Sequence, residues 1–480
     1  MSTNRLLVSL VLLLFFGTSC ILGWPLPKNV CKSPIDLVST SKPTTVVGTG
    51  TAVSCNESAL AAALAIGGIV TFNCGNQPAT ILITKQLNIS RTTDTTIDGN
   101  GLVTLDGTGQ TRILNFDRGD FRYSNITLTV QRLRFINGYC QDLEGGCAIF
   151  QKNGGTTIVI NCIFENNTGP VIGQDTAGGA IWTIGGGNST VVGSVFMQNK
   201  CSNGGAIGIL GSGLLIYNSH FESNQATGNG GNPGNGGNGG AISFDGRGRI
   251  NTICGTRFTK NQGNKFGGAF FRVSYNGDEQ NNLSYLLIDS NFIPANGNGL
   301  AGGLYIQGGT AMIESTTIVN NSATASGGIF FSNEKSVVLN NVNLLENQAY
   351  TGLGAAVYCS NPVSGTFTGF TVANNYAGAF GAAFSSCNTE VTLSQSIIAN
   401  NTVGNVWPAN ACTTTMNGGT NVIQSPIKKL PPAQYEDASC TNRGLTKIDN
   451  VSVVLDRQTW KIKVTGAQPS FVGPNIVPGL

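Results

Sequence analysis

Five charged side chains between residues 245 and 278 have the types and the spacing that a lyase acting on acidic glycans could use. They are Asp245, Arg257, Lys260, Arg272 and Asp278. Such a lyase needs a base, usually an arginine or a lysine, beside carboxylates that hold Ca²⁺ or neutralise the acid group of the substrate. Neighbouring structural units could gather these residues on one face. The alternative is that they are solvated charges of separate strands and loops.

Other chemistry finds less support in the sequence. The chain has one histidine, His220, which we interpret as an ordinary strand residue, and its cysteines show no C-x-x-C spacing for zinc. Calcium repeats of the G-G-x-G-x-D type are absent. The sequence therefore predicts no metal site and no cofactor, and Ca²⁺ enters only with the lyase alternative.

Composition and the N-terminus predict where the protein works. Charged residues are 11% of the 480 residues and the net charge is +3, without a basic cluster, so we expect no nucleic-acid partner. Arg5 and the apolar run after it indicate a secretory signal peptide over residues 1–23, and no later stretch is expected to span a membrane. The protein is predicted to be secreted, extracellular or attached to the cell wall or cell surface.

Cysteines and glycosylation motifs agree with secretion. Of 13 cysteines, all but Cys20 remain after cleavage, an even number suited to disulfides. Candidate disulfide partners are Cys55 with Cys74, Cys359 with Cys387 and Cys412 with Cys440. The Asn-x-Ser/Thr acceptors for N-glycosylation are Asn56, Asn88, Asn125, Asn166, Asn188, Asn282, Asn320, Asn400 and Asn450.

One phrase recurs along most of the chain: an aromatic or aliphatic opener, an Asn three residues later, and then a pair of glycines. The openers are Phe135, Phe164, Phe196, Phe221, Phe258, Phe292, Ile318, Leu344, Val372 and Ile398. Phe292 departs from the phrase because its Asn, Asn296, comes one residue late. Successive openers lie 25 to 37 residues apart. Residues of one type that recur at this period indicate stacked repeats.

The repeat predicts an all-β fold, a right-handed parallel β-helix (solenoid). Short segments such as TTIVINCIF alternate at period two, and Gly, Asn and Thr interrupt any helical run. The opener is expected to stack inside the helix, the Asn to end the strand and form a ladder along the axis, and the glycines to allow tight turns. We place the β-helix with its N-terminal cap at 24–405, including a capping helix at 53–66, and a C-terminal cap or tail at 406–480.

The phrases GGA[I/F] and FxxN resemble the repeats of chlamydial polymorphic outer-membrane proteins. The stretch from Cys55 to Gly107 resembles the N-terminal coils of right-handed, pectin-lyase-like β-helix proteins. The first resemblance implies an adhesin that binds protein partners. The second implies pectin-degrading enzymes, but the polygalacturonase motifs NTD, DD, His-Gly and RIK are absent from the chain.

A column of aromatic residues suggests a binding face. In each coil, an apolar residue that follows the glycines is expected to point inward. The residue directly after it is then expected to point outward. Its aromatic members are Phe150, Trp182, Phe271, Phe331 and Tyr358. Exposed, they would form a stripe on which sugar rings stack. The alternative is that inserted loops cover them.

These observations predict a secreted, non-catalytic protein that binds a polysaccharide or cell-surface glycan, or another surface, in the manner of an adhesin. A protein partner remains an alternative. The other alternative is a polysaccharide lyase or hydrolase acting on pectin-like acidic glycans.

Overall fold

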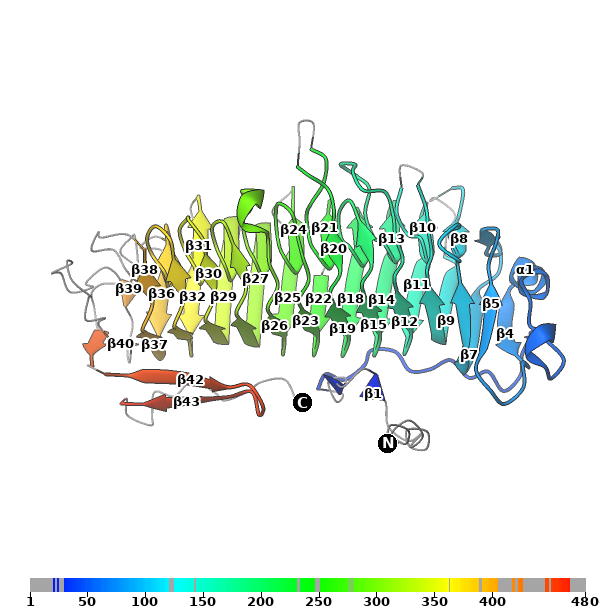
Figure 1. Cartoon of the computed structure of the whole chain (residues 1–480), viewed down its shortest axis with the longest axis horizontal. Helices are drawn as coiled ribbons and strands as arrows, with labels where there is room; N and C mark the ends of the chain where they lie inside the picture. The colour runs from blue at the N-terminus through cyan, green and yellow to red at the C-terminus, as the bar shows by residue number, and fades with distance from the viewer. Residues whose placement is uncertain are drawn as a thin grey trace, which may run out of the picture.

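The computed structural model shows a parallel β-helix of about 12 turns (Figure 1). The structure describes residues 20–21, 24–25, 30–120, 125–141, 144–230, 234–246, 251–275, 277, 279–361, 363–387, 391–404, 417–418, 422–425, 445–448 and 450–466. The coils stack along one long axis, and helix α1 (Glu57–Ile66) lies at the N-terminal end. The predicted parallel β-helix and its capping helix are confirmed, whereas its handedness stays a prediction.

Each coil places strands in three rows that run along the axis. Row one contains β6 (Leu87–Asn88), β8 (Leu114–Asp117), β10 (Ile149–Lys152), β13 (Ile181–Ile184), β17 (Ile207–Leu210), β21 (Ile242–Asp245), β24 (Phe270–Val273), β31 (Val357–Ser360) and β35 (Phe384–Ser385). Row two contains β3 (Thr45–Val47), β4 (Gly68–Phe72), β11 (Thr156–Ile160), β14 (Asn188–Val192), β18 (Gly213–Tyr217), β22 (Asn251–Cys254), β25 (Gln280–Ser284), β32 (Gly365–Thr368), β36 (Val391–Ser394) and β39 (Asn417–Gly418).

Each strand of row three ends at the same corner of its coil. It contains β5 (Ala79–Leu82), β12 (Ile163–Glu165), β15 (Val195–Met197), β19 (His220–Glu222), β23 (Arg257–Thr259), β26 (Leu287–Asp289), β33 (Thr371–Ala373), β37 (Ser396–Ala399), β40 (Val422–Ser425) and β41 (Leu445–Lys447). Long strands cross more than one row: β7 (Thr95–Asp106), β9 (Thr127–Ile136), β27 (Leu304–Val319) and β29 (Ile329–Leu345). Two-residue strands follow the corner: β16 (Lys200–Cys201), β20 (Gln225–Ala226), β28 (Ser322–Ala323), β30 (Gln348–Ala349), β34 (Tyr376–Ala377) and β38 (Thr402–Val403).

The recurrent phrase folds as predicted, with one correction. The Phe openers from Phe135 to Phe258 stack inside row three with ring centroids 4.7 to 5.0 Å apart. Ile288, and not Phe292, pairs with Phe258 and Ile318, so the opener at this coil was wrong. Its Asn, Asn291, is three residues on and hydrogen-bonds to Asn321, which removes the apparent irregularity.

The predicted asparagine ladder is confirmed. It consists of one buried asparagine per coil, directly after the corner residue that follows each strand of row three. Its members are Asn167, Asn199, Asn224, Asn261, Asn291, Asn321, Asn347, Asn375 and Asn401. Each side-chain amide donates to the Oδ1 atom of the next, over 2.8 to 3.1 Å. The residue before each ladder Asn has a left-handed backbone, for example Asn166 with φ 57°. Asparagine tolerates this conformation better than most residues.

Four disulfides are present among the described residues. The predicted Cys55–Cys74 and Cys359–Cys387 bonds are present, while Cys412 and Cys440 lie outside the described residues. Sequence reasoning missed Cys140–Cys147 and Cys31–Cys254. The latter joins residues 223 apart and ties an N-terminal strap, residues 31–44, along the lower side in Figure 1. The strap also hydrogen-bonds to the side chain of Gln131 through the backbone of Val38.

The C-terminal segment does more than close the last coil. Parallel pairing continues past the predicted boundary at residue 405, because β40 pairs with β37 and β41 with β40. The hairpin β42 (Ser452–Asp456) and β43 (Lys461–Thr465) then lies along the side of the solenoid, near its lower edge in Figure 1. Its buried residues pack on outward apolar residues of row three. These two sets are Val451, Val453, Leu455, Trp460 and Ile462, and Leu287, Val319, Leu345, Ala373, Ile397 and Ala399.

The predicted signal peptide at 1–23 lies outside the described residues except for β1 (Cys20–Ile21), which pairs with β2 (Trp24–Pro25). Short 3-10 helices occur at Ala52–Ser54 and Ala295–Gly297. Asn56 caps α1, since its Oδ1 atom accepts a hydrogen bond from the backbone of Ala59 over 3.0 Å.

Candidate functional site

The predicted aromatic stripe is not a free surface. Phe150, Trp182 and Phe271 are buried, and Tyr358 is half-buried. Phe150 and Trp182 pack with Ala177, whereas Phe271 belongs to a stack with Tyr305 and Phe330 that also contacts Phe266 and Leu300. Residues of the turns therefore cover the column, as the alternative interpretation expected. We do not retain the stripe as a sugar-binding face.

Phe331 was assigned to the wrong face. The coils that begin at Gly302 and Gly327 lack the alanine that follows the glycines elsewhere, so the register there is one residue shorter. Pairing places Tyr305 and Phe330 in the outer column, while Phe331 points into the core and is fully buried. A slip of one residue exchanges the two faces of a strand, which explains the error.

The five charged candidates do not form one site. Arg272 lies on β24 in the inward column of row one, fully buried, with its guanidinium 4.2 Å from the ring centroid of Phe244. Arg257 lies in row three and is buried, whereas Lys260 is exposed at the corner after β23. Asp245 accepts a hydrogen bond from the Tyr275 hydroxyl over 3.3 Å. Asp278 lies outside the described residues.

Burial raises the pKa of the Asp245 carboxyl, whereas the electrostatics of the arginines and of His220 do not indicate a base poised for catalysis. Burial lowers the pKa values of Arg257 and Arg272 to about 10, so both stay charged at neutral pH. Burial, with the charge of Arg257, lowers the pKa of His220 to about 4, so this histidine is neutral at pH 7. Within the described ranges, no group of three or more His, Cys, Asp and Glu side chains could hold a metal ion.

Glu334 makes the stability depend on pH. Burial raises the pKa of its carboxyl to about 8 from an ordinary value of 4.5, against weaker opposition from nearby backbone amides. The unfolded chain therefore loses this proton first as the pH rises, and the contribution of Glu334 to stability is expected to fall between about pH 5 and 8. The lowered pKa of His220 opposes this fall below about pH 6.5, so the net loss of stability is expected between about pH 6.5 and 8. One proton corresponds to about 1.4 kcal/mol per pH unit. Urea unfolding across this range should show that Glu334→Gln removes this slope, and an unchanged slope would contradict the assignment.

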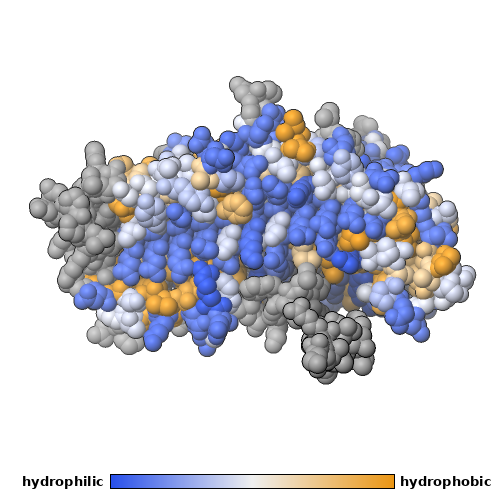
Figure 2. Space-filling model, viewed as in Figure 1, coloured by the Kyte–Doolittle hydropathy of each residue, from blue (hydrophilic) through white to orange (hydrophobic). Residues whose placement is uncertain are grey.

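The face of the molecule seen in Figure 2 is mostly hydrophilic along the coils. A cavity of about 390 Å³ opens at the corner after row three, near the N-terminal end. Its walls come from three successive coils. They are Asp106, Thr108, Gly109, Asn137, Gly138, Tyr139, Asn166 and Thr168.

Local backbone geometry places these side chains. Asp106 ends β7, and Asn137 and Asn166 follow β9 and β12 at the corner, where both have left-handed backbones. Gly138 replaces the ladder asparagine of its coil. A Cβ atom there would lie 2.3 Å from the carbonyl oxygen of Cys147. The two backbone segments therefore approach too closely for any residue other than glycine.

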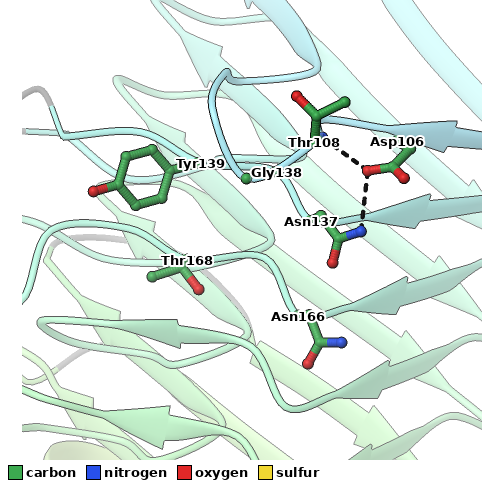
Figure 3. Close-up of a pocket in the computed structure, with 8 residues that line it drawn as sticks. Asp106, Thr108, Asn137, Gly138, Tyr139, Asn166 and Thr168 are labelled. Carbon is green, nitrogen blue, oxygen red and sulfur yellow. Dashed lines mark hydrogen bonds between the residues drawn. The ribbon is translucent and has the colours of Figure 1, made fainter. Parts of the chain in front are cut away.

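Hydrogen bonds hold the acidic end of the cavity in place. The Oδ1 atom of Asp106 accepts from the backbone of Thr108 over 2.8 Å and from the Nδ2 atom of Asn137 over 3.0 Å (Figure 3). Tyr139 lies on the other side of Gly138 and is 36% exposed. Asn166 lies one coil further along and is exposed.

The cavity combines the groups that proteins use to bind sugars. An aromatic ring can cover the apolar face of a pyranose, and a fixed carboxylate, amides and hydroxyls can bind its hydroxyl groups. The volume falls within the range of small-molecule sites. Asp106 is the one charged side chain among the lining residues, so the walls offer no cation to an acidic sugar.

The sequence analysis did not predict this binding cavity, although it named one of its residues, Asn166, as a glycosylation acceptor. The predicted acceptors are exposed except Asn282, which is half-buried, and their glycosylation stays a prediction. The signal for the cavity was the corner position itself, two residues after each opener. Asn137 and Asn166 occupy it in neighbouring coils.

Comparison with known proteins adds little. No protein-family model and no curated protein matches the chain. Among solved structures, PfbA, a surface adhesin of Streptococcus pneumoniae, is similar with 12% sequence identity and a TM-score of 0.33. The match covers 88% of this chain and 98% of PfbA. A likeness this distant carries no argument about function. None of the helices in the described residues is long and apolar enough to cross a membrane.

Proposed function

We propose that the protein is a secreted or cell-surface β-helix protein that binds a neutral glycan, without cleaving it, through the corner cavity at Asp106 and Tyr139. The observation that carries the proposal is the cavity itself. It brings a half-exposed aromatic ring together with one carboxylate, two asparagine amides and two threonine hydroxyls.

The disulfides support an extracellular location. Four are present among the described residues, and such bonds persist in oxidising compartments. The signal peptide and the glycosylation motifs of the sequence agree with it. Placement in a cell wall or on a cell surface is part of the proposal.

The arrangement favours binding over cleavage. Inverting and retaining glycosidases both use two carboxyl groups that flank the scissile bond, and one carboxylate lines the cavity. The basic candidates for a lyase, Arg257 and Arg272, are buried in different rows of the solenoid. Among the described residues, these two candidate bases therefore do not come together in one site.

Titration calorimetry tests this function with cellohexaose and N-acetylchitohexaose as neutral probes and oligogalacturonate as the acidic comparison. The protein should be made without N-glycans, because a glycan on Asn166 would occupy the cavity. We expect one of the neutral probes to bind, and Tyr139→Ala and Asp106→Asn each to weaken it at least about tenfold, or about 1.4 kcal/mol.

Tyr275→Ala is the control for this titration. Tyr275 follows β24 in row one, away from the corner, and is 68% exposed, against 36% for Tyr139. We expect this variant to bind like the unaltered protein. Equal losses in both tyrosine variants, binding of oligogalacturonate alone, or release of new reducing ends would each refute the proposal.

A further inference from the structure

The pattern of side chains at the Asp106 cavity occurs a second time. Asn137 and Tyr139 in one coil are followed by Asn166 and Thr168 in the next. At the same corner positions near the C-terminal end, Asn374 and Tyr376 are followed by Asn400 and Thr402. Strand pairing fixes the equivalence, because Tyr139 pairs with Thr168 and Tyr376 with Thr402.

A carboxylate precedes both sets by one coil. In the first set it is Asp106, the last residue of β7, and in the second it is Glu346, which lies one position later, at the corner itself. No other two neighbouring coils in the described part of the chain repeat Asn and Tyr followed by Asn and Thr at these positions. The column there reads Lys200, Gln225, Gln262, Phe292, Ser322 and Gln348 between the two sets.

The two sets differ in what meets their polar groups. At the C-terminal set, the Nδ2 atom of Asn374 donates to the carbonyl oxygen of Val453 over 2.9 Å, and that of Asn400 donates to the carbonyl oxygen of Val451 over 3.3 Å. Glu346 is paired with Arg457 over 2.6 Å. The hairpin β42–β43 and the residues beside it therefore use the groups that, at the first set, line an open cavity.

We propose that Glu346, Asn374, Tyr376, Asn400 and Thr402 form a second binding site for the same neutral glycan, which the C-terminal hairpin occupies. The asparagine amides donate to backbone carbonyl oxygens of the hairpin segment, where they would donate to hydroxyl oxygens of a bound sugar. Arg457 neutralises the carboxylate. The inference rests on the proposed function of the first cavity. Release of the hairpin uncovers the second site and makes the chain bivalent, which raises its avidity for a polymeric glycan.

The test counts binding sites by calorimetry, with the neutral hexaose that binds the chain made without N-glycans. The unaltered chain is expected to bind about one molecule. Leu455→Ala with Ile462→Ala, which weakens hairpin docking, and a chain ending at residue 449 are each expected to bind about two. Adding Tyr376→Ala to either should return the number to about one, while adding Tyr139→Ala should leave the Tyr376 site.

The outcomes separate this inference from the proposed function. A released chain that still binds about one hexaose, lost with Tyr139→Ala, overturns the second site and leaves the first. A released chain that binds only through Tyr376 overturns the first site and supports the second. The double variant keeps the full chain, so the test does not depend on the truncated form remaining soluble.

Discussion

Asn224→Ala is expected to lower the free energy of unfolding by about 2 to 6 kcal/mol. The Asn224 amide donates to Asn261 and to the carbonyl oxygen of Phe196, and its Oδ1 atom accepts from the backbone and the side chain of Asn199. All of these groups are buried. Alanine removes all four hydrogen bonds, but the Asn261 Oδ1 atom keeps the backbone N–H of Asn224 and the Asn199 amide keeps the carbonyl oxygen of Phe164. About two groups therefore lose their partner, at about 1 to 3 kcal/mol each. The midpoint of urea unfolding measures the loss.

Ser223→Asn is the control for this prediction. Ser223 precedes the ladder residue and has a left-handed backbone with φ 56°. Asparagine is suited to this conformation, so the control should be neutral or slightly stabilising. A loss below about 1 kcal/mol for Asn224→Ala would show that the ladder contributes little and that the stacked phenylalanines hold the coils together without it.

Leu455→Ala with Ile462→Ala is expected to undock the C-terminal hairpin. These residues face each other across β42 and β43 and are buried against row three. Each truncation should cost about 2 to 5 kcal/mol. The hairpin makes its contacts through one face, so the cost should appear as local opening rather than as unfolding of the coils. Hydrogen exchange at residues 450–466 should become fast while exchange in the central coils stays slow.

Val454→Ala is the matched control in the same hairpin. Val454 lies between the buried residues of β42 but is 57% exposed. We expect protection of the hairpin to be unchanged in this variant. If the double variant also keeps its protection, the apolar contacts with Leu345 and Ile397 do not hold the hairpin in place.

The sequence predicts the solenoid well because its period carries the structural information. An inward residue at the opener and an asparagine three residues later must recur once per coil, so both ladders can be seen without coordinates. Ile288 escaped detection because Phe292, four residues later, imitates an opener. Phe331 was placed outward because one missing residue after Gly328 reverses the faces of the strand.

The long-range features could not be predicted in the same way. Cys31 joins Cys254 across 223 residues, and nothing local distinguishes that pair from others. The cavity takes two or three ordinary residues from each of three coils, and only the stacking of the coils brings them together. The docking of the hairpin could not be predicted for the same reason, because the residues that it contacts lie in coils much earlier in the chain.

A crystal structure of the chain without N-glycans, with the neutral hexaose that binds it, will show whether the corner cavity holds the glycan. We expect a sugar ring against the Tyr139 side chain and a sugar hydroxyl within hydrogen-bonding distance of the Asp106 carboxylate. A hexaose bound elsewhere on the solenoid, with the corner cavity empty, would contradict this expectation.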